Sequence, residues 1–460
     1  MGELFGTDGI RGLANVHPMT AEIALRVGRA TAHWCRAARA SDGRPVPKGW
    51  RPRILIGKDT RRSCYMLENA LTAGICSMGG DVLLLGPMPT PGIAFLTRSM
   101  RAKAGLVISA SHNPYDDNGI KIFGREGYKI PDEVEQNIES MVLGTDLDAL
   151  RPTGSEIGRA KRIDDALGRY VVFCKSSFPE DLSLSGVKLV VDCAHGATYK
   201  AAPEVFWELG AEVELIGAEP NGLNINDKSG ALHPDRLAQR VAENGAAAGL
   251  AFDGDGDRLI VVDEQGTVLT GDHILAICAK EMKAKGTLRN NTVVSTVMSN
   301  IGFAIALKEM GITLERTQVG DRYVLEEMLA RDAVLGGEAS GHIIFRDHHT
   351  TGDGIIAALQ VLAVSLAQGK TLSELAQVMR MYPQKLVNID VARRPEIETE
   401  PAIVAAIAEA EAELGEEGRV LVRYSGTQPL CRVMAEGPTE ELTNQIVDRI
   451  ADVVRATIGA

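Results

Sequence analysis

The chain has 460 residues, enough for three or four domains of ordinary size, and 45% of its residues are hydrophobic. A net charge of −12 argues against a nucleic-acid partner, and seven scattered cysteines without a C-x-x-C spacing argue against a disulfide framework or a zinc site. No stretch approaches the ~20 apolar residues of a membrane span, and the start, MGELFGTDGIRG, does not read as a signal peptide, so we expect a cytoplasmic protein.

One pattern of secondary structure begins near residue 53 and again near residues 187 and 292. In the first copy, RILIGKD predicts a buried strand, MLENALTAGICSMGG a helix that ends at glycine, and DVLLLG and AGLVISA two further strands. The later copies repeat this order with little sequence identity, and their third strands are AGLAF and AVLGG. Strands that alternate with helices predict parallel α/β sheets covered on both faces.

Unusual polar residues follow the third strand of each copy. The three loops read SASHNP, DGDGDR and GGEASGH. Ligands of open parallel sheets bind at the carboxyl ends of the strands. We therefore expect the three loops to face one cleft.

The pattern changes after about residue 380. LVNIDV, an Ala/Glu-rich helix, the strand pair RVLVRYSGTQPLCRVMAEG and a closing helix predict a smaller α+β domain, whereas residues 36–53 suggest a basic surface loop. The predicted fold has three similar α/β domains with mixed or parallel sheets and a smaller C-terminal α+β domain. The predicted domains are residues 1–155, 156–257, 258–370 and 371–460.

Three carboxylates follow the predicted strand AGLAF. At a spacing of two residues on an extended chain, Asp253, Asp255 and Asp257 would point to one side, and such crowding is repulsive without a cation. Gly254 and Gly256 between them would let the backbone curl around an ion, and hard oxygen ligands favour magnesium or calcium. An EF-hand is rejected because Arg258 stands where that loop needs glycine and because the flanking segments predict strands.

Ser111 lies in SASHNP, between a predicted strand and an Asn-Pro turn. A serine at a turn is usually only a cap, and no G-x-S-x-G hydrolase motif is present. The acidic loop in the equivalent place of the next copy favours a catalytic role for Ser111 over a cap. A hydroxyl beside a metal site indicates phosphoryl transfer.

Two further motifs carry groups that suit a sugar phosphate. RYSGTQP, followed by Cys431 and Arg432, combines a glycine turn with hydroxyls and arginines that suit phosphate, although a surface hairpin remains the alternative. GGEASGH offers hydrogen-bonding groups for sugar hydroxyls. GKDTRRS lacks the first glycine of a phosphate-binding P-loop, so we interpret it as a polar strand-to-helix loop.

Nine motifs occur in one order over nearly the full length: FGTDGIRG, GPMPTP, SASHNP, NGIK, DCAHGA, AFDGDGDR, VGDRYV, TTGDG and SGTQP. Together they resemble the α-D-phosphohexomutase superfamily. The resemblance implies four domains, three alike and a smaller fourth, in agreement with the repeat. GPMPTP, DCAHGA and VGDRYV are similar to the members that act on amino sugars.

The resemblance also implies a reaction. Ser111 would be a phosphoserine whose phosphate completes the shell of one Mg²⁺ ion. Arg11 and Lys121 would flank the reacting oxygen, and His342 would assist. Glucosamine 6-phosphate, a phosphorylated hexosamine, would become glucosamine 1-phosphate through glucosamine 1,6-bisphosphate, for the synthesis of UDP-N-acetylglucosamine and cell-wall precursors. The metal ligands would be Asp253, Asp255 and Asp257.

Glu338 and Ser340 would bind sugar hydroxyls, and the late loop would hold the phosphate that is not reacting. The chain departs from the family pattern at Ala339, Tyr424 and Gln428. Two alternatives therefore stay open: a mutase of the same superfamily that prefers mannose or glucose, and a non-catalytic sugar-phosphate sensor. The sequence leaves the oligomeric state open, with a homodimer as one candidate. The implied phosphate-binding residues are Arg423, Ser425, Thr427 and Arg432.

Overall fold

The computed structural model describes the chain except residues 1, 7, 42–48, 145 and 426–429. It contains two compact units, each described by itself below. The first unit comprises Met1–Val297 and Glu315–Ala376, and the second comprises Met298–Leu314 and Gln377–Ala460.

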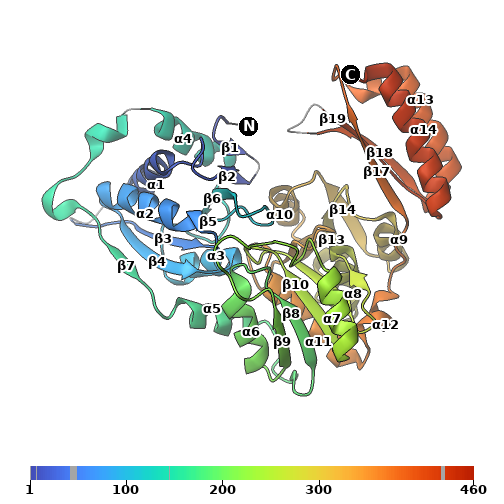
Figure 1. Cartoon of the computed structure of the whole chain (residues 1–460), viewed down its shortest axis with the longest axis horizontal. Coiled ribbons are helices and arrows are strands. Elements are labelled where there is room, and N and C mark those ends of the chain that lie inside the picture. Colours follow the sequence, from blue (N-terminus) through green and yellow to red (C-terminus); the bar gives the residue numbers. More distant parts are fainter. Residues whose placement is uncertain (1, 7, 42–48, 145, 426–429) are drawn as a thin grey trace. The chain divides into compact units, whose positions relative to one another are not determined.

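The first sheet of the first unit has seven strands in the order β1-β2-β6-β5-β3-β4-β7 (Figure 1). Its central strands β5, β3 and β4 are parallel, and β6 runs antiparallel to β5. The strand bounds are β1 Phe5–Gly6, β2 Gly9–Leu13, β3 Arg53–Lys58, β4 Asp81–Pro87, β5 Ala104–Ile108, β6 Asp117–Gly124 and β7 Ala160–Arg162.

Side chains of alternate residues in these strands pack on opposite faces of the sheet. Ile54 and Ile56 of β3 belong to the buried cluster that helices α1 and α2 complete. Gly57 faces the other side, where a side chain would meet Ile93 of helix α3. Helices therefore cover both faces of the sheet, as the strand-helix alternation predicts. The helix bounds are α1 Ala21–Ser41, α2 Ser63–Ser77, α3 Thr90–Ser99 and α4 Asp132–Leu143.

Two smaller sheets repeat this topology, in the orders β12-β11-β10-β8-β9 and β14-β13-β15-β16. In each, the third strand of the copy pairs parallel with the first, and the next strand turns back antiparallel. The sheets are therefore mixed. The bounds are β8 Lys188–Asp192, β9 Glu212–Ile216, β10 Ala248–Phe252, β11 Leu259–Asp263, β12 Val268–Leu269, β13 Thr292–Thr296, β14 Thr313–Thr317, β15 Leu335–Gly337 and β16 Ile343–Phe345.

The remaining helices of the first unit pack on these two sheets or link the domains. No helix in the described part of the chain combines the length and the apolar composition of a membrane span. Their bounds are α5 Ala166–Lys175, α6 Thr198–Glu208, α7 Asp235–Asn244, α8 Gly271–Ala284, α10 Asp321–Ala330, α11 Gly354–Gln368 and α12 Leu372–Ala376.

The second unit contains an antiparallel sheet, β17-β19-β18, with two helices packed on it. It also includes helix α9, although the strands β13 and β15 of the same repeat belong to the first unit. The fold class predicted from sequence is confirmed: three similar α/β domains and a smaller C-terminal domain. The bounds are α9 Ile301–Glu309, β17 Gln384–Asp390, α13 Pro401–Leu414, β18 Arg419–Tyr424, β19 Leu430–Glu436 and α14 Glu440–Ile458.

Candidate active site

Ser111 lies three residues after β5 and is buried, with 1% of its surface exposed. Its hydroxyl donates a hydrogen bond to the Asp253 carboxylate at 2.6 Å, and its Oγ lies 3.4 Å from His112 Nδ1. Burial, followed by the charges of Arg258 and Arg11, lowers the pKa of His112 to about 4. The imidazole is therefore neutral at pH 7, and the serine faces the acidic loop directly.

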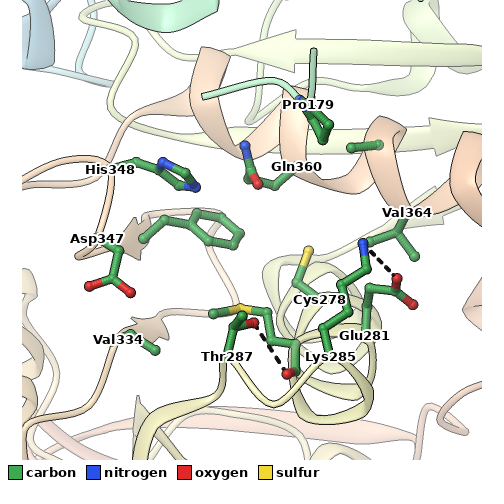
Figure 2. Close-up of a pocket in the computed structure, with 13 residues that line it drawn as sticks. Pro179, Cys278, Glu281, Lys285, Thr287, Val334, Asp347, His348, Gln360 and Val364 are labelled. Atoms are coloured by element: carbon green, nitrogen blue, oxygen red, sulfur yellow. Dashed lines mark hydrogen bonds and ion pairs between the residues drawn. The ribbon is translucent and has the colours of Figure 1, made fainter. Parts of the chain in front are cut away.

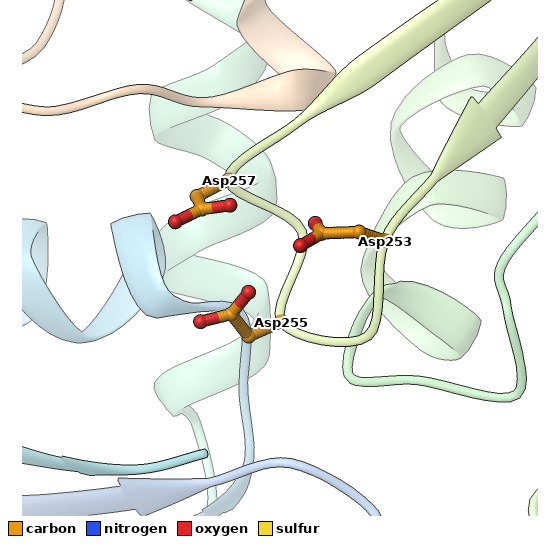
Figure 3. A group of neighbouring side chains, drawn as sticks. All are labelled: Asp253, Asp255 and Asp257. Carbon is orange, nitrogen blue, oxygen red and sulfur yellow. The ribbon is translucent and has the colours of Figure 1, made fainter. Parts of the chain in front are cut away.

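The three aspartates follow β10 in a tight turn (Figure 3). One carboxylate oxygen of each lies within 4.8 Å of the others. The backbone curls at the intervening glycines, since Gly256 has φ +74°. A side chain at Gly254 would come within 2.5 Å of the Ser111 carbonyl oxygen. The curl of the loop, rather than strand alternation, brings the carboxylates together.

The electrostatics of this turn fit a cation. Burial and the neighbouring carboxylates raise the pKa of Asp253 and of Asp257. Among the described residues, Asp255 Oδ1 and Asp257 Oδ1 are buried without a hydrogen-bond partner. Buried acceptors without donors are costly, and a Mg²⁺ ion would satisfy both oxygens and neutralise the repulsion. The strands β10 and β11 flank the turn, which confirms that it is not an EF-hand.

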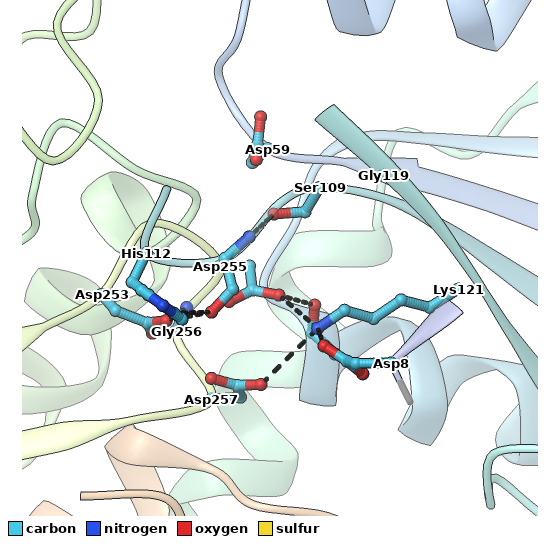
Figure 4. Close-up of polar contacts among 12 residues, drawn as sticks. Asp8, Asp59, Ser109, His112, Gly119, Lys121, Asp253, Asp255, Gly256 and Asp257 are labelled. Carbon is cyan, nitrogen blue, oxygen red and sulfur yellow. Dashed lines mark hydrogen bonds and ion pairs between the residues drawn. The ribbon is translucent and has the colours of Figure 1, made fainter. Parts of the chain in front are cut away.

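Domain 1, the part of the chain with strands β1–β7, supplies two partners for Asp255. Thr90, in GPMPTP, donates its hydroxyl to Asp255 Oδ2 at 2.7 Å, and Lys121 Nζ lies 3.3 Å from the same oxygen. Burial disfavours the charge on Lys121, but Asp255, Asp8 and Asp257 outweigh it and raise its pKa. Lys121 is thus a buried cation held against the acidic loop of Asp253, Asp255 and Asp257 (Figure 4).

Asp8 connects the cations of domain 1. Its carboxylate pairs with Lys121 at 3.1 Å and with Arg11 and Lys129. Arg11 lies on β2 and Lys121 on the adjacent β6, so the sheet brings these two predicted site residues close together. Burial opposes ionisation of Asp8, but Lys121 and the other two cations lower its pKa.

The hairpin of β15 and β16 brings GGEASGH to the acidic loop, since Arg258 and His342 pair as an isolated bridge. His342 Nε2 lies 4.0 Å from Asp257, and both ring nitrogens are buried without a hydrogen-bond partner among the described residues. Glu338 is buried and accepts a hydrogen bond from Gly320, whereas Ser340 is exposed. A carboxylate, a hydroxyl and an imidazole therefore lie in one hairpin.

The predicted phosphate-binding residues belong to the second unit. Arg423 and Arg432 are direct cross-strand partners in β18 and β19. Burial and the charge of Arg432 lower the pKa of Arg423. Like charges placed directly opposite destabilise a sheet, so the pair indicates an anion site. Ser425 is buried at the start of the adjoining loop, and Thr427 lies outside the described residues.

The interpretation from sequence missed four residues that support this site. Asp8 and Thr90 contact its charged groups, and His112 lies beside Ser111. Arg61 contacts the serine loop from GKDTRRS. Asp8, Thr90 and His112 lie within the motifs FGTDGIRG, GPMPTP and SASHNP. Their place in these motifs is the sequence signal that could have identified them. Nothing in the spacing of GKDTRRS indicates where the Arg61 side chain points.

A separate cavity of about 260 Å³ lies between α8, α11 and the chain around His348 (Figure 2). Cys278 and Val364 contribute apolar surface, and Lys285 pairs with Glu281 at 2.9 Å on one side of it. None of its lining residues belongs to the predicted site, so we assign it no role in the chemistry.

Four models of the phosphoglucomutase/phosphomannomutase family match the chain in order. Alpha/beta/alpha domains I, II and III match residues 2–148, 169–266 and 270–382, and the C-terminal domain matches residues 386–453. A phosphoglucosamine mutase of Syntrophus aciditrophicus is 58% identical over 459 residues, which is 100% of both chains. One from Geotalea daltonii is 57% identical and covers 100% of this chain and 99% of its own.

Solved structures share the fold. A phosphoglucomutase/phosphomannomutase family protein of Burkholderia thailandensis has a TM-score of 0.79 at 24% identity, covering 99% of this chain and 97% of its own. Aspergillus fumigatus N-acetylphosphoglucosamine mutase in complex with GlcNAc-6P and magnesium has a TM-score of 0.68 at 17% identity, covering 99% and 96%.

Proposed function

Because this chain belongs to the phosphoglucomutase/phosphomannomutase family, we propose that it is a phosphohexomutase that interconverts glucosamine 6-phosphate and glucosamine 1-phosphate. Identity of 55–58% to curated phosphoglucosamine mutases, over 98% or more of each chain, supports the amino sugar. The observation that carries the chemistry is the Ser111 hydroxyl, buried against the cluster of metal-binding carboxylates. The product would serve the synthesis of UDP-N-acetylglucosamine.

The reaction proceeds in two transfers. In the first, O1 of glucosamine 6-phosphate attacks the phosphorus on Ser111, the bond from phosphorus to Oγ breaks, and the O1 proton leaves to a nearby base. In the second, Ser111 Oγ attacks the phosphorus of the 6-phosphate of the 1,6-bisphosphate, the bond from phosphorus to O6 breaks, and O6 takes up the proton to give glucosamine 1-phosphate. One bound Mg²⁺, held by Asp253, Asp255 and Asp257, would supply charge neutralisation for both transfers.

The chain's other residues take roles that follow from their charge. Lys121 and Arg11 stabilise negative charge at the transferring phosphoryl group, and His342, whose ring nitrogens have no hydrogen-bond partner among the described residues, is available for the proton. Glu338 and Ser340 bind sugar hydroxyls. The phosphate that does not react binds to Arg423, Arg432, Ser425 and Thr427.

Kinetics with three sugars tests this proposal. We expect the highest kcat/KM with glucosamine 6-phosphate, compared with glucose and mannose 6-phosphates. A mannose preference would instead assign the chain to the phosphomannomutase activity of the same family. Absence of turnover, together with an intact mass that carries no phosphate, would favour the sugar-phosphate sensor. A cytoplasmic location and a homodimer stay predictions from the sequence.

A further inference from the structure

Arg61, in the GKDTRRS loop between β3 and α2, is the largest side chain that is fully buried among the described residues. Its guanidinium donates hydrogen bonds to the carbonyl oxygens of Ser111 at 3.2 Å, Asn113 at 2.6 Å and Pro114 at 3.4 Å. It also pairs with the buried carboxylate of Asp59. One side chain therefore holds three backbone carbonyls of the serine loop.

Domain 2, the part of the chain with strands β8–β12, supplies a second donor for two of these carbonyls. Asn226 Nδ2 donates to the carbonyl oxygens of Ser111 at 2.9 Å and Asn113 at 3.0 Å. The GKDTRRS loop itself reaches this domain, because Thr60 donates its hydroxyl to the carbonyl oxygen of His195 at 2.6 Å. The backbone of the serine loop is thus fixed jointly by domains 1 and 2.

The conformation of the serine loop requires such support. Ser111 has φ +51°, a region that residues other than glycine adopt at a cost and keep only where the surroundings enforce it. Its carbonyl oxygen also lies so close to Gly254 that no side chain fits there. Without donors, buried carbonyls would add a further cost. The loop would then relax and carry the hydroxyl away from Asp253.

We propose that Arg61 is a positioning residue for phosphoryl transfer, acting through the backbone of the Ser111 loop, with Asn226 as its partner from domain 2. This inference rests on the proposed mutase function and deepens it. With 0% of its surface exposed, Arg61 does not reach the substrate. Its planar fork serves several acceptors at once, which a lysine ammonium on the same stem does not reproduce.

The test compares Arg61→Lys with Lys58→Met, a matched control. Lys58 is also buried, lies on adjoining β3, and forms an ion pair with Glu68 at 2.6 Å. Its ammonium lies over the Tyr65 ring and makes no hydrogen bond or ion pair with the described residues of the serine loop. For Arg61→Lys we expect kcat to fall about 100-fold while KM stays within about twofold. A displacement of the Ser111 hydroxyl by about 1 Å is enough to lower the rate of transfer by about that factor. Lys58→Met should lose stability and keep kcat per folded molecule.

Asn226→Ala provides a second measurement if Arg61→Lys does not fold. It removes two donors from the same carbonyls, and we expect it to lower kcat in the same direction with KM nearly unchanged. Unchanged kcat in folded Arg61→Lys, or in Asn226→Ala where Arg61→Lys fails to fold, would overturn the inference. A wild-type chain without turnover on any hexose 6-phosphate would instead remove the proposed function, which keeps the two failures distinct.

Discussion

At the scale of single residues, Ser111 differs from an ordinary turn serine in how many neighbours constrain it. Its amide donates to Ser109 Oγ at 2.9 Å, its carbonyl accepts from two side chains, and its hydroxyl donates to Asp253. Hydrogen bonds to its amide, its carbonyl and its hydroxyl hold Ser111 in one conformation. Such preorganisation lowers the activation free energy, because the reacting group does not have to be positioned during the transfer.

Ser111→Ala should therefore abolish turnover. Loss of a covalent nucleophile costs roughly 10⁴-fold to 10⁶-fold in kcat. Circular dichroism should show the fold retained, and intact mass should show that the phosphate of the wild-type protein is absent. Ser176→Ala, at an exposed serine after α5, serves as the control with normal turnover. Substantial residual activity in Ser111→Ala would refute the covalent route.

Asp255→Asn tests whether the acidic loop binds Mg²⁺. Asp255 contacts both Thr90 and Lys121, so this change removes one charge from the turn and keeps the side-chain shape. We expect the Mg²⁺ concentration for half-maximal activity to rise roughly tenfold or more, with a lower kcat. Calorimetric titration with Mg²⁺ alone should show the same weakening. Asp165→Asn, at an exposed aspartate, is the control, and an unchanged metal dependence of Asp255→Asn would move the site elsewhere.

At the scale of elements, helix α11 begins with a buried cap. The Asp353 side chain accepts from the amides of Ile355 and Ile356 and from the Tyr170 hydroxyl at 2.8 Å. Burial outweighs these donors and raises the pKa of Asp353 to about 7. The folded protein therefore binds a proton at this carboxyl more tightly than the unfolded chain does, where the pKa is about 3.9.

Asp353 makes the stability of the folded protein depend on pH. Between about pH 4 and pH 7, the contribution of Asp353 to the free energy of unfolding falls as the pH rises, by up to about 4 kcal/mol. Asp353→Asn cannot titrate, so its stability relative to the wild type should improve from pH 5 to pH 8. Urea unfolding at several pH values measures this difference. A constant offset between the two proteins across this range would contradict the assignment.

Much of the fold was predictable because its signals are local. Strand and helix periodicity located β3, α2 and their counterparts in the later copies, and equivalent strand ends brought the loops of Ser111, Asp253 and Glu338 into one unit. The family resemblance added the site residues by motif.

What could not be predicted depends on contacts distant in sequence. The basic loop expected at residues 36–53 is partly wrong, because helix α1 continues to Ser41. The alanines and arginines of residues 36–40 are strong helix formers, and this propensity outweighs the polarity that suggested a loop. Arg61 is a charged residue in a polar loop, and only the folded chain shows it buried beneath Ser111. Burial of such groups is not encoded in local periodicity.

At the scale of the whole molecule, ion pairs join domain 3 to domain 1 within the first unit. Lys129 lies between Asp8 of domain 1 and Asp321 at the start of α10, with Nζ 2.5 Å from Asp321. Next to it, Arg322 pairs with Glu135 of α4 at 3.0 Å. Because Asp321 also lies 3.8 Å from His342, this contact links the hairpin of β15 and β16 to the cations around Asp8.

A double-mutant cycle with Lys129→Met and Asp321→Leu measures this coupling. Lys129→Met leaves Asp321 without its lysine, and Asp321→Leu leaves Lys129 with Asp8 alone. Removing one member of a buried ion pair is more costly than removing both. We therefore expect the double variant to be more stable than the sum of the single losses, by about 1–3 kcal/mol in urea unfolding. Lys385→Met with Asp448→Leu, an exposed pair in the second unit, should show less than about 1 kcal/mol. Additive losses at Lys129 and Asp321 would mean that the two domains are held by packing rather than by this pair.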